Sequence, residues 1–201
     1  MFMRRRPPLN SILLEERMVA YLDIGAEWFL EKLNEPTALE TTSSCMGRIS
    51  LIEGPWPWER RSDTRIVFKS HSWVNPQRLA LECVKPYENL WLKVTGPIIH
   101  FRTPSPSCAR WLLSIAREEG FKHSGVISIP EEDIGEKSYV IEVTAPTGFS
   151  TPLRLNWRCM IPPSSLRELS RASIMALALG RKRLAKLALR VSSEWRESPC
   201  L

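Results

Sequence analysis

Thr41–Ile49 reads TTSSCMGRI and leads into the β-branched run Ile49–Ile52. Within seven residues it carries hydroxyl and thiol side chains, one glycine and one arginine: Thr42, Ser43, Ser44, Cys45, Gly47 and Arg48. Hydroxyls form short hydrogen bonds, glycine lets a backbone approach closely, and arginine offers a planar fork to a carboxylate or phosphate. The stretch is interpreted as a ligand-binding bend before a strand, although a plain turn has the same composition.

Helical and strand periodicities follow one another on both sides of this stretch. Residues 10–33 have helical spacing that is interrupted at Gly25, and Asp23 is a candidate cap for the second helix. Further along, the pattern predicts strands over 49–52, 65–70, 90–94, 98–102, 125–129, 138–144 and 153–157, and helices over 75–83, 105–119 and 164–191. Two prolines stiffen the turn Gly54–Trp58, so Trp56 and Trp58 are expected to project onto the sheet or towards a base.

A weak internal repeat relates Cys45–Glu53 to His123–Glu131, with Gly, Ile, Ser and Glu identical, although chance gives similar matches over nine residues. The order of elements around the two copies is also shared. We therefore expect an α+β fold, a mixed β-sheet with flanking helices, with α/β as the alternative. Residues 1–201 are expected to form a single compact domain, or two intertwined repeats of about 10–95 and 96–191 that share one core. In the repeat interpretation, Lys122 and Ser124 face the first turn across a cleft.

The net charge of +6 concentrates at the two ends of the chain. Residues 4–6 are arginines, and residues 164–201 hold eight cations against three glutamates. Twenty of the 28 cations are arginine, which suits phosphate contact and base stacking, so either a nucleic-acid partner or a solubilising bias is indicated. Lys182, Lys186 and Arg190 recur every four residues on the last helix, where they either follow an RNA backbone or form a solvated face.

The five cysteines are widely spaced, without a C-x-x-C pair or a Cys/His cluster at zinc spacing. We therefore expect no metal site. The apolar runs are too short for a secretory signal or a membrane span. These features predict a cytoplasmic protein with reduced thiols and no membrane contact.

Three histidines, His71, His100 and His123, are candidates either for proton transfer or for plain structural roles. Cys45 has no histidine at a spacing typical of thiol enzymes, so a nucleophilic role for it is a minor alternative. Neither G-x-G-x-x-G nor G-x-x-x-x-G-K-[ST] occurs. The residues alone predict an RNA-associated protein with a polar Ser/Thr/Gly pocket.

Thr41–Ile49 closely resembles the T-S-S-C-S-G-R-I signature of the third wybutosine-synthesising enzyme family. Further landmarks of that family occur in the same order, namely Leu33-Asn34, Ser70-His71, Ile99-His100 and Gly120–Gly125, and the resemblance covers roughly residues 20–190. Asp23 stands where the family tends to carry an acid. Met46 departs from the pattern, because the family usually has serine at this position.

The resemblance implies a methyltransferase that uses S-adenosylmethionine without a Rossmann-type fold, in agreement with the missing glycine fingerprint. It implies as target a ring nitrogen of the 4-demethylwyosine-type base just 3′ of the anticodon in tRNA(Phe). That base lies in the single-stranded anticodon loop, from which it can be turned into a pocket at modest unstacking cost.

Roles are assigned to individual residues as hypotheses. His71 is the candidate general base, with Asp23 or His100 as substitutes, and the candidate cofactor- or substrate-binding residues are Thr42, Ser43, Ser44, Cys45, Gly47, Arg48, His100, Lys122 and Ser124. Lys182, Lys186 and Arg190 are the candidate tRNA contacts, and no obligate protein partner is expected. The main rival interpretation is a non-catalytic RNA-binding module, and the more distant rival is a thiol-dependent enzyme.

Overall fold

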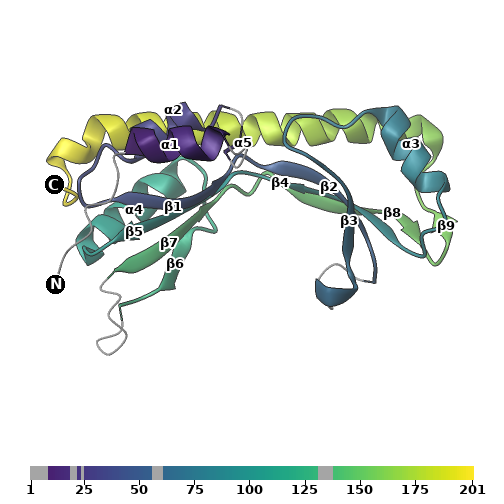
Figure 1. The fold of residues 1–201 in the computed structure, drawn as a ribbon, viewed down its shortest axis with the longest axis horizontal. Helices are drawn as coiled ribbons and strands as arrows, with labels where there is room; N and C mark the ends of the chain where they lie inside the picture. Colours follow the sequence, from purple (N-terminus) through teal and green to yellow (C-terminus); the bar gives the residue numbers. More distant parts are fainter. Residues whose placement is uncertain (1–8, 19–21, 24, 56–60, 131–137) are drawn as a thin grey trace.

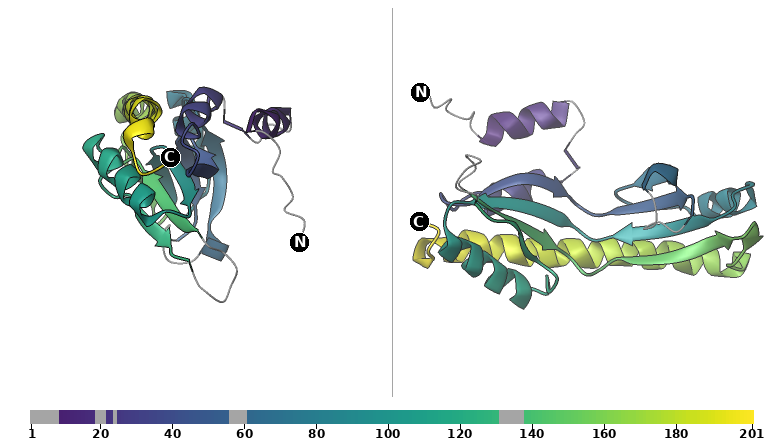
Figure 2. Two further views of the ribbon diagram at one scale, coloured as in Figure 1. Left: turned by 90° about the vertical axis from the view of Figure 1, so that its left-hand side faces the viewer. Right: turned by 90° about the horizontal axis from the view of Figure 1, so that it is seen from below.

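One long helix, α5 (Leu166–Glu194), runs along the molecule, and two β-sheets lie side by side beneath it (Figures 1 and 2). The computed structural model describes residues 9–18, 22–23, 25–55, 61–130 and 138–201. With 29 residues, α5 is about 43 Å long, which is long enough to cover both sheets. The predicted positions of Trp56 and Trp58 lie outside the described residues.

Sheet A has the strand order β1-β5-β7-β6, and sheet B has the order β3-β2-β4-β8-β9. The strands of sheet A are β1 (Glu40–Cys45), β5 (Ile98–Thr103), β7 (Tyr139–Thr144) and β6 (Gly125–Ser128). Those of sheet B are β3 (Arg65–Ser70), β2 (Arg48–Glu53), β4 (Leu90–Thr95), β8 (Phe149–Leu155) and β9 (Arg158–Cys159). The remaining helices are α1 (Leu9–Met18), α2 (Glu27–Leu33), α3 (Pro76–Val84) and α4 (Pro106–Glu118), with 3-10 turns at Arg61–Asp63, Pro163–Ser165 and Trp195–Glu197.

The α+β class expected from the sequence is confirmed, with helices flanking antiparallel strands. The strands divide into two sheets rather than the one mixed sheet that was expected, and every pairing within the described residues is antiparallel. Gly96-Pro97 joins β4 to β5, and these two strands belong to different sheets, so the turn does not form a hairpin.

Three connections cross between the sheets and meet against α5, at Met46–Gly47, Gly96–Pro97 and Ala145–Gly148. We call this region, together with Gly180 of α5, the waist. Gly47 has φ +86°, and a Cβ on it would lie 2.8 Å from the Thr95 carbonyl oxygen. A Cβ on Gly180 would lie 2.5 Å from the Pro97 ring. Glycine at these two positions lets the crossing chains and the helix pack closely.

Each sheet has its own buried cluster, and α5 contributes to both. Under sheet A, Phe101 and Ile141 belong to a cluster that includes Leu184 and Leu187 of α5. Under sheet B, the cluster contains Ile49, Leu51, Leu79, Leu90, Leu92, Leu153, Leu166 and Leu177, of which the last two come from α5. The helix therefore joins two cores that the sheets alone would leave separate.

The starts of α3 and α4 follow the capping signals in the sequence. The Asn75 side chain accepts the Gln77 N–H at the start of α3, and the Ser105 side chain accepts the Cys108 N–H at the start of α4. The expected cap of α2 by Asp23 is wrong, because α2 begins after Ala26 without a side-chain cap. The Asp23 carboxylate has other partners at the waist.

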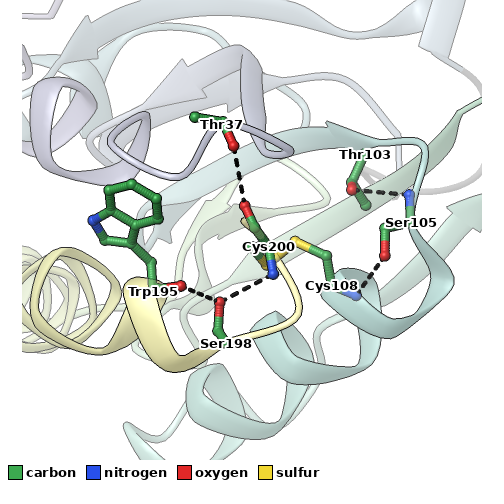
Figure 3. Close-up of a disulfide and its surroundings, with 7 residues drawn as sticks. All are labelled: Thr37, Thr103, Ser105, Cys108, Trp195, Ser198 and Cys200. Carbon is green, nitrogen blue, oxygen red and sulfur yellow. Dashed lines mark hydrogen bonds between the residues drawn. A yellow bond between two sulfur atoms is a disulfide. The ribbon is translucent and has the colours of Figure 1, made fainter.

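A disulfide links Cys108 of α4 to Cys200 near the C-terminus, across 92 residues of sequence (Figure 3). The Thr37 hydroxyl donates to the Cys200 carbonyl, and the Cys200 N–H donates to Ser198 Oγ. The expectation of reduced thiols is wrong for this pair, while Cys45, Cys83 and Cys159 are free. Sequence spacing gave no signal because the two partners meet only through the tertiary fold.

Within the part of the chain that is described, no helix has both the length and the apolar character needed to cross a membrane.

Candidate functional site

Asp23, Cys45 and His71 converge at the waist from three segments far apart in sequence. Asp23 Oδ2 accepts the Met46 backbone N–H at 2.7 Å, and Asp23 Oδ1 lies 3.2 Å from His71 Nδ1. Cys45 ends β1, and its sulfur lies within 4.8 Å of the facing ligand atoms of Asp23 and His71. All three residues are half-buried, so their chemistry is sheltered but accessible to a ligand.

The contacts of His71 determine which of its ring nitrogens carries the proton. Nδ1 lies 3.0 Å from the Gly47 carbonyl oxygen as well as 3.2 Å from the Asp23 carboxylate. Both partners only accept hydrogen bonds when Asp23 is ionised, so Nδ1 is assigned as the N–H donor. In neutral His71, Nε2 then carries the lone pair. The pair is therefore arranged to take up a proton at Nε2 while Asp23 stabilises the resulting imidazolium.

A Cys/His/Asp set is also a donor set that zinc can use. Metal binding through Nδ1 would require that nitrogen without its proton, whereas the Gly47 carbonyl at 3.0 Å favours the protonated form. The observed contacts of His71 Nδ1 thus describe a hydrogen-bonded acid–base pair better than a set of metal ligands.

Arg181 of α5 supports this arrangement from the helix side. Its Nε donates to the Met46 carbonyl at 3.1 Å, and one of its terminal nitrogens donates to the His71 carbonyl. The guanidinium thus ties the β1–β2 connection to the segment after β3. Arg181 could not be predicted from the sequence, because it stands in a run of cations with nothing to distinguish it from its neighbours.

Met46 occupies the position at which the family signature usually has serine. Its side chain is 2% exposed and packs in the core under sheet A. Its contribution to the waist is made by backbone atoms, with the N–H donated to Asp23 and the carbonyl accepting from Arg181. These two contacts do not require a hydroxyl at position 46.

A second polar group crosses the outer face of sheet A, the face opposite its buried side chains. Ser43, His100 and Glu142 are direct cross-strand neighbours on β1, β5 and β7. Ser43 Oγ lies 2.9 Å from His100 Nδ1, and His100 Nε2 lies 2.9 Å from Glu142 Oε2. Cys45 follows Ser43 by two residues on β1, so both side chains point to this face. Ser43 and His100 are candidates from the sequence, but Glu142 is not, because only the strand register brings it beside them.

The other residues of the signature lie on both sides of the waist. Thr42 is exposed and its hydroxyl donates to the His100 carbonyl at 3.5 Å, while half-buried Ser44 faces Ile99 across the strands. Arg48 begins β2 in sheet B, opposite Thr95. Thr41–Ile49 is therefore two strands of different sheets joined by a tight connection, and not the single bend that was expected. The polar residues of β1 obscured its strand pattern because they lie on an edge strand with a solvated face.

Lys122 and Ser124 are placed differently from the repeat interpretation. Ser124 is 4% exposed, and its hydroxyl accepts the Thr144 N–H at 3.1 Å, so it is committed to the backbone of sheet A. Lys122 is exposed before β6. Gly125 begins an edge strand and its Cβ position is open, whereas Gly47 joins two sheets at positive φ. The two Ser/Gly turns are thus not equivalent in backbone geometry.

The cations of α5 differ in availability. Lys182 and Lys186 are exposed. Arg190 instead contacts three carboxylates, with Glu194 at 2.9 Å, Glu118 at 2.9 Å and Glu119 at 3.3 Å. The hydrogen bonds to these carboxylates, above all the one to Glu194, raise the pKa of the Arg190 guanidinium above its ordinary value. Arg190 therefore joins α4 to α5, and its charge is already compensated.

Comparisons with known proteins point to one family. The family model described as Methyltransferase TYW3 matches residues 9–193. Over 145 residues the chain is 45% identical to the tRNA(Phe) 7-((3-amino-3-carboxypropyl)-4-demethylwyosine(37)-N(4))-methyltransferase of Aeropyrum pernix, covering 72% of this chain and 74% of that one. The protein of the same name from Saccharolobus solfataricus is 36% identical over 132 residues, covering 65% of this chain and 62% of that one. The crystal structure of a hypothetical protein from Aeropyrum pernix matches with a TM-score of 0.76 at 37% identity, covering 85% of this chain and 97% of that one. The chain therefore belongs to the TYW3 methyltransferase family.

Proposed function

We propose that this protein transfers a methyl group from S-adenosylmethionine to the N4 ring nitrogen of a 4-demethylwyosine-type base at position 37 of tRNA(Phe). The observation that carries the proposal is the Asp23–His71 pair at the waist, which is built around the residues of the family signature. The names of the two relatives support the choice of substrate. The proposal includes a cytoplasmic location, where tRNA is used in translation.

In this proposal His71 is the general base. Its Nε2 lone pair takes the proton that leaves the ring nitrogen, and Asp23 together with the Gly47 carbonyl holds the protonated Nδ1. Asp23 is fixed in turn by the Met46 N–H, so the ring has one preferred orientation. Orientation matters because a methyl transfer requires donor and acceptor atoms in line at near-contact distance.

S-adenosylmethionine supplies an electrophilic methyl group when bound. The signature residues fit its zwitterionic amino-acid chain in chemical character, because Thr42 and Ser43 expose hydroxyl oxygens and Arg48 offers a cation for a carboxylate. Within the described residues, the Arg48 guanidinium has no hydrogen bond or ion pair of its own. We assign Arg48 to the carboxylate and place Ser44, Cys45 and the Gly47 backbone around the bound ligands.

The tRNA is proposed to contact the exposed cations outside the waist. Lys182 and Lys186 are suited to the phosphates of the anticodon arm, and Lys122 to a phosphate nearer sheet A. Arg190 is left out of this set because its three carboxylate partners already satisfy it. Ser124 is left out because its hydroxyl holds the Thr144 N–H.

The test is mass analysis of precursor tRNA(Phe) after incubation with the protein and S-adenosylmethionine. One added methyl group is expected with the wild type, and a loss of about 100-fold or more in rate is expected with His71→Gln. His123→Gln is the matched control, because His123 is exposed and lies outside the site. Full activity of His71→Gln would exclude His71 as the base.

Two further measurements separate this proposal from its rivals. A non-catalytic RNA-binding module would bind tRNA but give no heat of binding with S-adenosylmethionine. A thiol-dependent enzyme would lose activity in Cys45→Ser, whereas the proposed mechanism predicts activity within a few-fold of the wild type. Arg48→Ala should weaken cofactor binding with the melting temperature within a few degrees, and a protein that unfolds instead would make Arg48 structural.

A further inference from the structure

The Ser43–His100–Glu142 row has a fixed direction of proton donation. Glu142 is a carboxylate and accepts, so His100 Nε2, 2.9 Å away, is the donor. In neutral His100 the other nitrogen, Nδ1, must then accept, and the Ser43 hydroxyl 2.9 Å away must donate to it. The Ser43 oxygen is left with lone pairs and no proton to offer. Ser43 therefore presents a hydrogen-bond acceptor to the outer face of sheet A.

Thr42 has the same polarity. Its hydroxyl is directed to the His100 carbonyl at 3.5 Å, so its oxygen also presents lone pairs outward. Both residues are exposed. On edge strand β1, Thr42 lies within the register shift between Thr41 and Ser43, and Ser43 directly follows it. Such a bulge at a sheet edge re-aims neighbouring side chains. Two adjacent hydroxyl oxygens on one surface are thus available to a ligand that brings several donors.

The charge of the row favours a cation. Glu142 supplies one negative charge, and its side chain is 36% exposed, so part of its field reaches the surface. In the adjacent row towards the waist, the neighbours Cys45, Ile98 and Thr144 are uncharged residue types. In the row on the other side, Glu40 faces Arg102, and their opposite charges offset each other. Among the residues of these three rows, Glu142 is thus the charged residue that faces no opposite charge while His100 is neutral.

We propose that Ser43, positioned by His100 and Glu142, is the subsite for the α-ammonium group of an aminocarboxypropyl chain. An ammonium has three N–H donors and one positive charge, which match the acceptor oxygens and the carboxylate behind them. The inference rests on the proposed function, because two reactants there carry this chain. S-adenosylmethionine bears it on sulfur, and the base named for both relatives bears it as a 3-amino-3-carboxypropyl group.

Within this subsite Glu142 is a positioning residue, since it acts on the ligand through His100 and Ser43. The Glu142→Gln substitution keeps a side-chain oxygen that can accept from His100 Nε2 but removes the charge. It therefore separates the electrostatic role from the cross-strand hydrogen bond. Nitrogen-15 NMR of the free wild-type protein should show His100 protonated at Nε2 and unprotonated at Nδ1, and the reverse tautomer would overturn the proposal.

Two binding arms distinguish the sources of the ammonium. In the first, calorimetry compares S-adenosylhomocysteine with 5′-methylthioadenosine, which has the same nucleoside thioether but lacks the amino-acid chain. In the second, binding of tRNA(Phe) carrying the aminocarboxypropyl base is compared with binding of tRNA(Phe) carrying the unextended tricyclic base. In each arm, the ratio of the two binding constants gives the preference for the ligand that carries the aminocarboxypropyl chain. This preference ratio is measured in the wild type, Glu142→Gln and Ser43→Ala. The controls are Glu31→Gln and Ser150→Ala, which are exposed and lie off this face.

A fall of about 5- to 10-fold in one preference ratio is expected in both row variants, since the lost hydrogen bond to a charged group is partly exposed. A fall in the first arm assigns the ammonium to the methyl donor, and a fall in the second assigns it to the base. If the row has only a structural role, its loss weakens binding of both ligands in an arm equally. Unchanged preference ratios in both arms would therefore overturn the proposal and leave the row as a structural set of cross-strand hydrogen bonds. If S-adenosylhomocysteine fails to bind, the second arm decides.

The failure of the proposed function would look different. If no tRNA gains a methyl group while the preference of the wild type for S-adenosylhomocysteine falls in Glu142→Gln, the subsite stands and the methyl acceptor is wrong. If methyl transfer occurs and neither ratio moves, the function stands and the subsite is wrong.

Discussion

Replacing Cys200 with alanine removes the covalent link between the C-terminus and the start of α4 (Figure 3). Both sulfur-bearing residues are fully buried, so the link sits inside the core under sheet A. Alanine adds no polar group, the released Cys108 thiol packs as a small apolar side chain, and the hydrogen bond from the Ala38 N–H to the carbonyl of residue 200 remains available. The main change is therefore the loss of a constraint on the unfolded chain.

The magnitude follows from the length of the closed loop. For 92 residues the chain-entropy relation gives roughly 4.6 kcal/mol at 25 °C as an upper value, and native disulfides of this kind typically contribute about 2–4 kcal/mol. A chain of 201 residues has an unfolding entropy of about 0.42 kcal/mol/K near its midpoint. The melting temperature should therefore fall by about 5–11 °C.

The assay is urea unfolding followed by circular dichroism, with calorimetry for the melting temperature. Cys108→Ala and the double variant Cys108→Ala/Cys200→Ala should lose the same free energy as Cys200→Ala, because each removes the same bond. Cys159→Ala is the control, since this cysteine is free and exposed. A single-variant loss below about 0.5 kcal/mol, or a double-variant loss near the sum of the singles, would refute the loop-closure reasoning.

Other consequences of the structure are measurable in the same way. Arg181→Gln should lower kcat/KM for methyl transfer by about 10- to 100-fold, because the loops that carry the general base lose their hydrogen bonds to α5. The melting temperature should stay within a few degrees, and unchanged kinetics would contradict the positioning role. Although burial acts against it, hydrogen bonds from Lys85 and Tyr87 hold the pKa of Glu82 below its usual value. Its stabilising effect is therefore present above the unfolded-state pKa of 4.5 and is lost as the pH falls through the lower folded-state value. Glu82→Gln should cost about 2 kcal/mol at pH 7 in urea unfolding and progressively less as the pH falls below 4.5, and a loss independent of pH would contradict this. Burial, with the neighbouring thiol of Cys159, raises the pKa of the Cys83 thiol to about 12. Iodoacetamide at pH 8 should therefore modify Cys83 at least about 1,000-fold more slowly than an ordinary exposed thiol, as followed by peptide mass analysis. Equal rates would show that Cys83 is not sequestered.

Helix starts and isolated strands were predictable from the sequence because their signals are local. Asn75-Pro76 and Ser105-Pro106 fix the starts of α3 and α4 through one side-chain acceptor and one proline each. The strand over Arg65–Ser70 was predicted with the bounds that the structure has. The division into two sheets was not predictable in this way, because strand pairing depends on the three connections at the waist, which carry the chain from one sheet to the other. A Gly-Pro pair signals a turn but does not specify whether the next strand returns to the same sheet.

The candidate site shows the same division between local and long-range information. The signature residues and the two histidines were identified from their chemistry and from the family resemblance. Sequence could not pair Asp23 with His71, Glu142 with His100, or Arg181 with two loop carbonyls, because each contact joins segments separated by 42 or more residues. Only the register of sheet A and the path of α5 bring these groups together.

The order of residues in Thr41–Ile49 follows from its course through the waist. Ser43 and Cys45 point to the outer face because they alternate along β1, and Met46 turns into the core as the chain leaves sheet A. Its backbone N–H and the Gly47 carbonyl then hold Asp23 and His71, and positive φ at Gly47 sets the chain on course for sheet B. An alanine at position 47 would be strained by its φ and would clash with Leu177 and Thr95. By contrast, the side chain of residue 46 needs only to fill the core, so the waist tolerates methionine there and requires glycine next to it.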